Sequence, residues 1–115
     1  MVARETLLIY PDWNKLFDIH TDASDQQLGA VISQNGKPIA FFSRRLSKAQ
    51  RNYTTTEKEL LSIVECLKQF RGILFGYEIN VFSDHKILVY YAATVSESQR
   101  VMRWRLILKE FGPNI

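Results

Sequence analysis

Cysteine is almost absent from this chain, since Cys66 is the single one among 115 residues. One thiol cannot close an internal disulfide, so a disulfide-stapled framework is excluded. Cys66 lies among Val64, Leu67 and Phe70 at helical spacing, where cysteine is commonly a buried apolar residue. We therefore expect Cys66 to belong to the core and assign it no chemistry.

Long apolar runs are also missing. None approaches the roughly 20 residues that span a bilayer, and Arg4 and Glu5 interrupt the N-terminal stretch in which a secretory leader would be apolar. The sequence therefore favours a soluble, intracellular protein with no membrane partner. Hydrophobic residues at 46% and charged residues at 23% are ordinary for a globular protein, and the length suits one domain. A net charge of +3 is a weak sign of a polyanionic partner.

Three strands are predicted in the first third of the chain. Residues 15–21 alternate apolar and polar side chains with the period of a strand, and two apolar runs follow at 28–32 and 38–42. Asn35-Gly36 separates these runs, and this pair is typical of a tight hairpin because both residues tolerate a positive φ. The first third is therefore expected to be an antiparallel meander.

A long helix is predicted to begin near Thr54, because Thr residues precede Glu57 and Glu59 by three positions in the manner of a capping box. Gly72 and Gly76 are expected to loosen and then end it. One face of this helix is expected to pack on the sheet. That face carries Leu60, Ile63, Val64, Leu67, Phe70 and Leu74.

A fourth strand is predicted at 77–82, and further helices at 89–93 and 99–111. The helix between the third and fourth strands indicates a crossover that returns the fourth strand beside the first, in an α/β layer design. Ligand sites in such sheets lie outside the strand ends. Asp22 and Asp84, which end the first and fourth strands, are therefore expected to lie together.

Asp22, Asp84 and Glu59, which lies in the first turn of the predicted helix, form the candidate chemical constellation. Converging carboxylates repel one another unless a hard divalent cation such as Mg²⁺ neutralises them, and paired Mg²⁺ ions suit phosphodiester hydrolysis. Each residue alone has a plainer explanation, as a turn residue, a cap or a partner of the helix dipole. Only their combination indicates the chemistry.

These residues sit in strings that resemble a known family along nearly the whole chain. The family is the ribonuclease H domain of gypsy-type (Metaviridae) LTR retrotransposon reverse transcriptase polyproteins. The strings are, in order, Thr21-Asp22-Ala23-Ser24-Asp25, Leu28-Gly29-Ala30-Val31, Phe42-Ser43-Arg44-Arg45-Leu46, Tyr53-Thr54-Thr55-Thr56-Glu57-Lys58-Glu59-Leu60 and Ser83-Asp84-His85.

The resemblance implies a ribonuclease H-like fold, in which a three-stranded antiparallel meander is extended by parallel strands and helices pack on the sheet. It implies endonucleolytic hydrolysis of the RNA strand of RNA–DNA hybrids during reverse transcription, with two Mg²⁺ ions that Mn²⁺ can replace. Asp22, Glu59 and Asp84 match the family's catalytic and metal-binding carboxylates. Glu59 is preferred to Glu57 because it directly precedes Leu60, which leaves Glu57 as a capping residue.

The resemblance also implies a setting for the chain. Residues 1–14 are expected to end the connection from an upstream polymerase domain, and residues 15–115 to form the ribonuclease H-like domain. The parent polyprotein is expected in the cytoplasm, within a virus-like particle. No oligomeric state is predicted.

Substrate contacts are assigned to three residues. Ser24 is the candidate for contact with RNA 2′-hydroxyls, although a serine that orders its own loop is an equal alternative. Arg44 and Arg45 are the candidates for backbone phosphates, although a solvated basic face is the plainer interpretation. The same two interpretations apply to Lys48, Arg51, Arg100, Arg103 and Arg105, whereas Trp13 and Trp104 are predicted to be core residues. For His85, capping or packing is at least as good an interpretation as proton transfer.

The chain departs from the family at its end. Family members continue through a fifth strand to a fourth acidic residue in an Ala-Asp-like motif, and neither Glu97 nor Glu110 lies in such a motif. We therefore expect a C-terminally truncated domain whose final strand is missing or incomplete. The alternative function is a catalytically impaired or inactive hybrid-binding or scaffolding module. An integrase core, a third possibility, is disfavoured by the string Tyr53 to Leu60.

Overall fold

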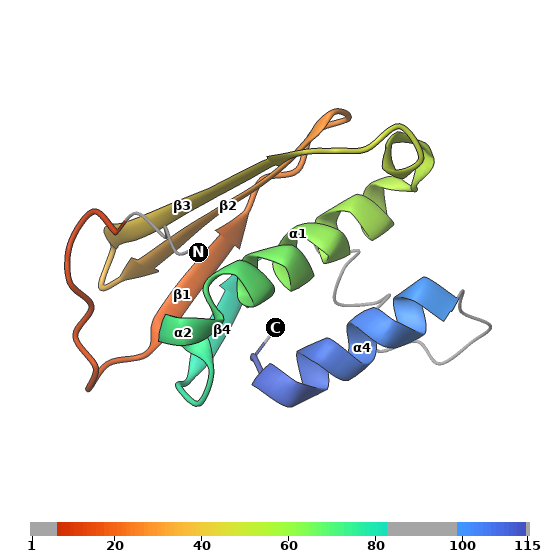
Figure 1. Ribbon diagram of the computed structural model, residues 1–115. Coiled ribbons are helices and arrows are strands. Elements are labelled where there is room, and N and C mark those ends of the chain that lie inside the picture. The colour runs from red at the N-terminus through yellow and green to blue at the C-terminus, as the bar shows by residue number, and fades with distance from the viewer. Residues whose placement is uncertain (1–6, 83–98, 115) are drawn as a thin grey trace.

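The computed structural model describes residues 7–82 and 99–114. It contains one mixed sheet, with the long helix α1 against one face and α4 beside α1 (Figure 1). The elements are β1 (Phe17–Thr21), β2 (Gln27–Gln34), β3 (Lys37–Arg45), the 3₁₀ turn η1 (Gln50–Asn52), α1 (Thr55–Gln69), α2 (Arg71–Leu74), β4 (Ile79–Phe82) and α4 (Gln99–Phe111).

The sheet has the order β3-β2-β1-β4, with β1, β2 and β3 antiparallel and β4 parallel to β1. This confirms the meander and the crossover that returns the fourth strand beside the first. The hairpin between β2 and β3 is also confirmed, because Asn35 and Gly36 both have positive φ, 51° and 78°.

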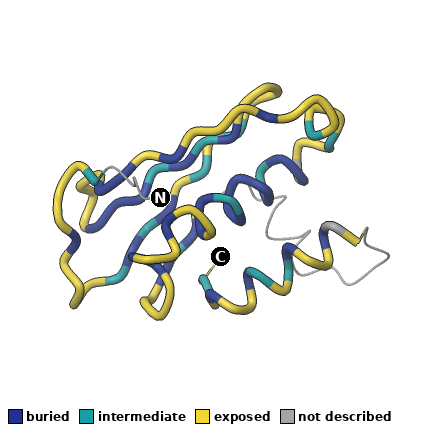
Figure 2. Tube along the Cα trace, viewed as in Figure 1, coloured by how far each residue is buried: buried dark blue, intermediate teal, exposed yellow. Residues whose placement is uncertain are grey.

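Helix α1 begins with the expected capping box, in which Thr54 and Glu57 each bond the other's backbone N–H. Its predicted apolar face is buried against the sheet, and α4 covers a second side (Figure 2). Ser62 and Cys66 of α1 are buried as well, so Cys66 is a core residue as predicted. Burial raises the pKa of its thiol to about 12.

Several boundaries differ from the sequence prediction, among them those of β3 and α1. Strand β3 runs on to Arg45, which pairs with Gln27, although residues 43–45 are polar. A ladder needs only backbone N–H and C=O groups, so exposed polar residues can continue it. Near the other end of the sheet, α1 stops at Gln69 and a separate short α2 follows.

The C-terminal helix α4 is confirmed at its predicted limits and is followed by Gly112 at a φ of 63°. Asn114 then makes an isolated parallel bridge to Asn80 on β4, in which the Val81 N–H donates to the Asn114 carbonyl at 2.7 Å and the Asn114 N–H donates to the Ile79 carbonyl at 2.8 Å. The helix predicted at 89–93 lies outside the described residues.

The two tryptophans differ in burial. Trp104 on α4 is buried as predicted, but the prediction for Trp13 is wrong, because 45% of it is exposed. Trp13 lies before β1, where its ring contacts Tyr77 and Phe17 at centroid distances of 5.3 and 6.2 Å. At that edge no further layer covers it in the described part of the chain.

Candidate active site

Asp22 directly follows β1 and is exposed at the end of the strand. Its backbone N–H donates to the Gly29 carbonyl on β2 at 2.8 Å. The Asp22 carbonyl oxygen passes so close to Gly29 that a Cβ there would lie 2.8 Å from it, which requires a shift. Glycine at position 29 therefore sets how closely the backbone of Asp22 approaches β2.

Ser24 orders the loop between β1 and β2. Its hydroxyl oxygen accepts from the Gln27 and Gln26 N–H groups at 3.1 and 3.4 Å, and the hydroxyl lies 3.3 Å from the Gln27 carbonyl, to which it donates. The loop-ordering interpretation of Ser24 is thus observed. Ser24 is also exposed, so this role leaves its surface open to a ligand.

Glu59 lies early in α1 and is half-buried. Glu57 is occupied by the capping box, since its Oε1 accepts from the Thr54 N–H at 2.9 Å. The prediction that Glu57 is the cap is therefore confirmed. The start of α1 is held against the loop after Asp22, because Lys58 Nζ donates to the Asp25 carbonyl at 3.3 Å. Asp22 and Glu59 thus belong to segments that meet at one end of the sheet.

Asp84 lies outside the described residues, as do Ser83 and His85. The described part of β4 ends at Phe82, which pairs with His20 of the parallel strand β1 and stacks on its ring at 4.7 Å. Asp22 and Asp84 each follow this pair by two positions in the sequence. Within residues 7–82 and 99–114 no group of three His, Cys, Asp or Glu side chains is close enough to hold a metal ion.

A hollow of about 270 Å³ opens beside Asp22. Sequence reasoning missed two of its residues, Gln27 and Ser43, whose side chains are joined by a hydrogen bond of 2.6 Å from Gln27 Nε2 to Ser43 Oγ. They meet because β2 and β3 pair with Gly29 opposite Ser43, which no local pattern indicates. The hollow is lined by Asp22, Ser24, Gln27, Leu28, Gly29 and Ser43.

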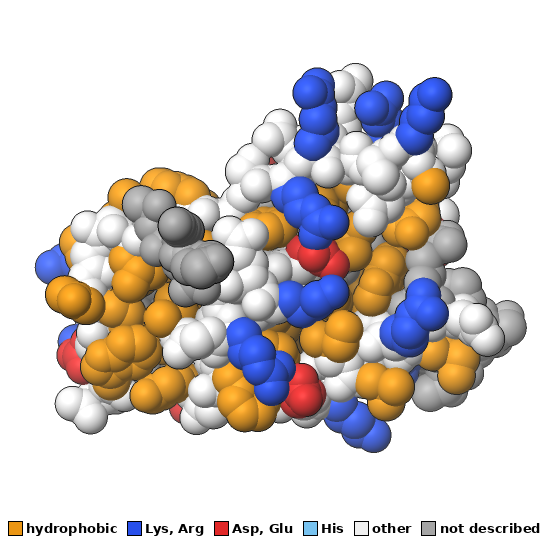
Figure 3. Space-filling model, in the orientation of Figure 1, with side chains coloured by type: hydrophobic (Ala, Val, Ile, Leu, Met, Phe, Trp, Pro, Cys, Tyr) orange, Lys and Arg blue, Asp and Glu red, His pale blue; other side chains and the backbone are white. Residues whose placement is uncertain are grey.

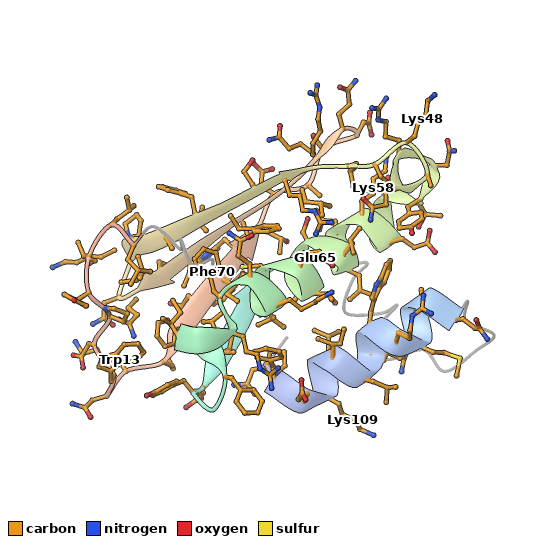
Figure 4. All side chains as sticks on the ribbon, viewed as in Figure 1. Trp13, Lys48, Lys58, Glu65, Phe70 and Lys109 are labelled. Carbon is orange, nitrogen blue, oxygen red and sulfur yellow. The ribbon has the colours of Figure 1, made fainter. Side chains whose placement is uncertain are left out.

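The two arginines that the sequence offers as phosphate contacts, Arg44 and Arg45, have different surroundings. Arg44 is bonded to Glu65 of α1, which also lies 3.5 Å from Lys68, whereas Arg45 is exposed at the end of β3. Lys and Arg side chains project from one end of the molecule, and Lys48 lies there (Figures 3 and 4).

The remaining basic residues were less specific candidates. Arg51 and Arg103 are exposed and Arg105 is half-buried, while the Arg100 side chain is outside the described part. Glu110 is bonded to Arg71 Nη1 at 2.9 Å. Glu97 lies outside the described residues.

The sheet order and the carboxylate after β1 define a protein of the ribonuclease H-like fold. Solved structures agree with this class. The native prototype foamy virus protease-reverse transcriptase superposes with a TM-score of 0.75 at 18% identity, over 93% of this chain and 15% of that one. A foamy viral protease-reverse transcriptase in complex with an RNA/DNA hybrid gives 0.71 at 20% identity, over 90% and 15%.

Residues 12–111 match the family described as the RNase H-like domain found in reverse transcriptase, and the chain belongs to this family. Its relatives include Pol polyproteins of gypsy-type retrotransposons, as the sequence strings predicted. The gypsy polyprotein of Drosophila melanogaster is 38% identical over 116 residues, which cover 100% of this chain and 11% of the polyprotein. That of Drosophila transposon 297 is 42% identical over 111 residues, or 96% and 10%. The chain therefore spans about a tenth of these relatives.

No helix in the described ranges is both long and apolar enough to cross a membrane.

Proposed function

We propose that this chain hydrolyses the RNA strand of RNA–DNA hybrids endonucleolytically during reverse transcription. The observation that carries the proposal is the meeting of the loop after Asp22 with the start of α1, the segment that carries Glu59. Family membership supports it, and so does the likeness in fold to a foamy viral reverse transcriptase solved with an RNA/DNA hybrid.

Asp22, Glu59 and Asp84 are the proposed ligands of two Mg²⁺ ions, for which Mn²⁺ can substitute. The donor chemistry fits, because hard cations prefer oxygen ligands and the hollow beside Asp22 carries a carboxylate and two hydroxyls but no Lys or Arg among its lining residues. Bound there, the ions would lower the pKa of a coordinated water and stabilise charge on the phosphodiester. The carboxylates would hold and orient these ions, Asp22 from the end of β1 and Glu59 from α1.

Substrate binding is proposed for Ser24, Arg44 and Arg45. Ser24 lines the hollow next to Asp22, so its exposed surface can meet a ribose hydroxyl of the RNA strand. Arg45 is exposed and can contact a phosphate directly, whereas Arg44 would first have to leave Glu65. Arg45 is therefore the stronger phosphate contact of the two.

The setting proposed for the parent protein follows from its relatives. We propose that residues 1–14 end the connection from an upstream polymerase domain of the same polyprotein, and that the polyprotein acts in the cytoplasm within a virus-like particle. Relatives named as Pol polyproteins, of which the matched segment is 11% and 10%, support this setting.

The alternative is a hybrid-binding or scaffolding module with impaired or no catalysis. It is favoured by one observation. Among the described residues 7–82 and 99–114, no three His, Cys, Asp or Glu side chains lie close enough together to hold a metal ion. Such a module would bind hybrids without cutting them.

The test is cleavage of a labelled RNA–DNA hybrid with Mg²⁺ or Mn²⁺, and with a chelator. The change is Asp22→Asn, and the matched control is Asp18→Asn on the same strand, outside the proposed site. We expect metal-dependent cutting of the RNA strand that falls by at least about 100-fold in Asp22→Asn, because the lost charge weakens metal binding, and that persists in Asp18→Asn. An RNA duplex should resist cutting.

Equal cutting by Asp22→Asn and the unaltered chain would contradict the proposed site. Hybrid binding without any cutting by the unaltered chain would instead support the alternative module.

A further inference from the structure

Lys58 occupies an unexpected place for a lysine. It lies in the first turns of α1, where the positive end of the helix dipole disfavours a cation, and it is only 8% exposed. Burying an ammonium group costs free energy unless hydrogen bonds compensate for lost water. Because both the helix dipole and burial disfavour a lysine here, a contact of the Lys58 ammonium group is needed to offset the free-energy cost.

The contact is to the backbone of the loop that follows Asp22. Lys58 Nζ donates to the Asp25 carbonyl oxygen at 3.3 Å and lies 3.9 Å from the Asp25 carboxylate, whose side chain is 99% exposed (Lys58 is labelled in Figure 4). The ion pair is long and open to solvent, so it is weak. The carbonyl is therefore the partner that matters, and Lys58 holds the path of the loop.

Other bonds hold the same loop from the sheet. Asp22 is tied to Gly29 of β2, and the Gln26 carbonyl accepts from the N–H of Leu46, which follows β3. Lys58 adds a tie from α1. It is also the residue next to Glu59, so it connects the segment that carries one proposed metal ligand to the segment that carries another.

We propose that Lys58 is a positioning residue: by holding the loop after Asp22 against α1, it sets the separation of the Asp22 and Glu59 carboxylates and so the affinity for the divalent metal. The proposal rests on the metal site of the proposed function. Mg²⁺ demands near-ideal octahedral geometry, so a small displacement of one ligand weakens binding. Groups that orient metal ligands are typically worth about 10- to 100-fold in metal affinity or activity.

The test compares Lys58→Met, which keeps the apolar stem and loses the donor, with Lys68→Met, which removes a half-exposed lysine from the same helix. Mn²⁺ binding to the free chain is followed by electron paramagnetic resonance, and cleavage is measured over a range of metal concentrations. For Lys58→Met we expect Mn²⁺ binding about tenfold weaker and a half-maximal metal concentration about tenfold higher. Excess metal should restore cutting, and Lys58→Arg, which keeps a donor, should recover most of the affinity.

Hybrid affinity measured in chelator should be equal for both methionine variants, since a role in metal geometry leaves it unchanged. Unaltered Mn²⁺ affinity in Lys58→Met would overturn the proposal, as would absence of Mn²⁺ binding by the unaltered chain. If the unaltered chain binds Mn²⁺ and cuts nothing, the nuclease function fails while the Mn²⁺ comparison still decides the role of Lys58.

A measurement on the unaltered chain covers the case in which Lys58→Met does not fold. In a ¹H–¹⁵N spectrum of lysine ammonium groups, Lys58 should give a signal protected from solvent exchange. That signal should move on Mg²⁺ addition with the same midpoint as the Asp22 amide. A signal indifferent to Mg²⁺ would overturn the proposal.

Discussion

The two faces of the sheet are built from the same strands and differ in burial and in the side chains that they carry. Phe17 and Ile19 of β1 point under α1 and are fully buried, whereas Asp18 and His20 alternate with them and face away from the helices. Because successive side chains on a strand point to opposite faces, a single strand serves a core and a surface at once. The face that α1 covers holds the domain together, and within residues 7–82 and 99–114 no helix covers the other, which is called the uncovered face below.

The uncovered face is not purely polar. Phe41, Val31, His20 and Phe82 are neighbours in register, one on each strand, and form a row across the sheet. Phe41 is 57% exposed and Phe82 49% exposed. Exposed apolar atoms gain little of the free energy that burial supplies, so this row should matter far less to folding than residues one position away.

The largest expected effect is on the covered face. Ile19→Ala removes a fully buried side chain from β1, which lies between β2 and β4 in the sheet. We expect the free energy of unfolding to fall by about 2–5 kcal/mol, because apolar burial is lost and a cavity is left. Urea unfolding followed by circular dichroism measures it. A loss no greater than that of a surface substitution would mean that the covered face is not the core.

A smaller effect on the free energy of unfolding is expected from the thiol of Cys66, which is buried on α1. Burial raises the pKa of its thiol from 9.0 to about 12, so the folded chain holds the proton that the unfolded chain releases near pH 9. The stabilising contribution is therefore complete below pH 9 and is lost as the pH rises toward 12. At pH 10 the loss should be roughly 1 kcal/mol relative to pH 8.

The control for this pH effect is Cys66→Ala, which lacks the thiol and shares the other titrating groups. Unfolding free energies of both chains at pH 8 and pH 10 give the comparison. Parallel pH profiles would show that the Cys66 thiol is accessible to water in the folded chain.

The covered face and the capping box could be predicted from the sequence because both depend on local spacing. Period-2 and helical patterns identify buried residues, and Thr54 with Glu57 forms a cap within one turn of α1. The contacts of Lys58 with Asp25, and of Gln27 with Ser43, could not be predicted. They depend on how distant segments are placed in register, which no short pattern encodes.

Trp13 also shows that contacts between distant segments cannot be predicted from a short pattern. An aromatic residue near a strand was expected in the core, yet its place depends on whether another layer covers that edge. The arrangement of Asp22 and Glu59 was predicted through strand order and family strings, and their joint role with Asp84 stays a prediction.

The smallest expected effect lies on the uncovered face and uses two neighbours in sequence. Phe41→Thr keeps a residue that favours strands and removes a ring that is 57% exposed and lies in register with Val31 of β2. We expect a loss of less than about 1 kcal/mol. Phe42→Thr is the matched change one residue on, and it should cost about 3 kcal/mol or more because Phe42 is buried on the helix side. Urea unfolding of both variants decides. Equal losses in the free energy of unfolding would mean that Phe41 is packed as tightly as Phe42. Both faces of the sheet would then contribute equally to stability.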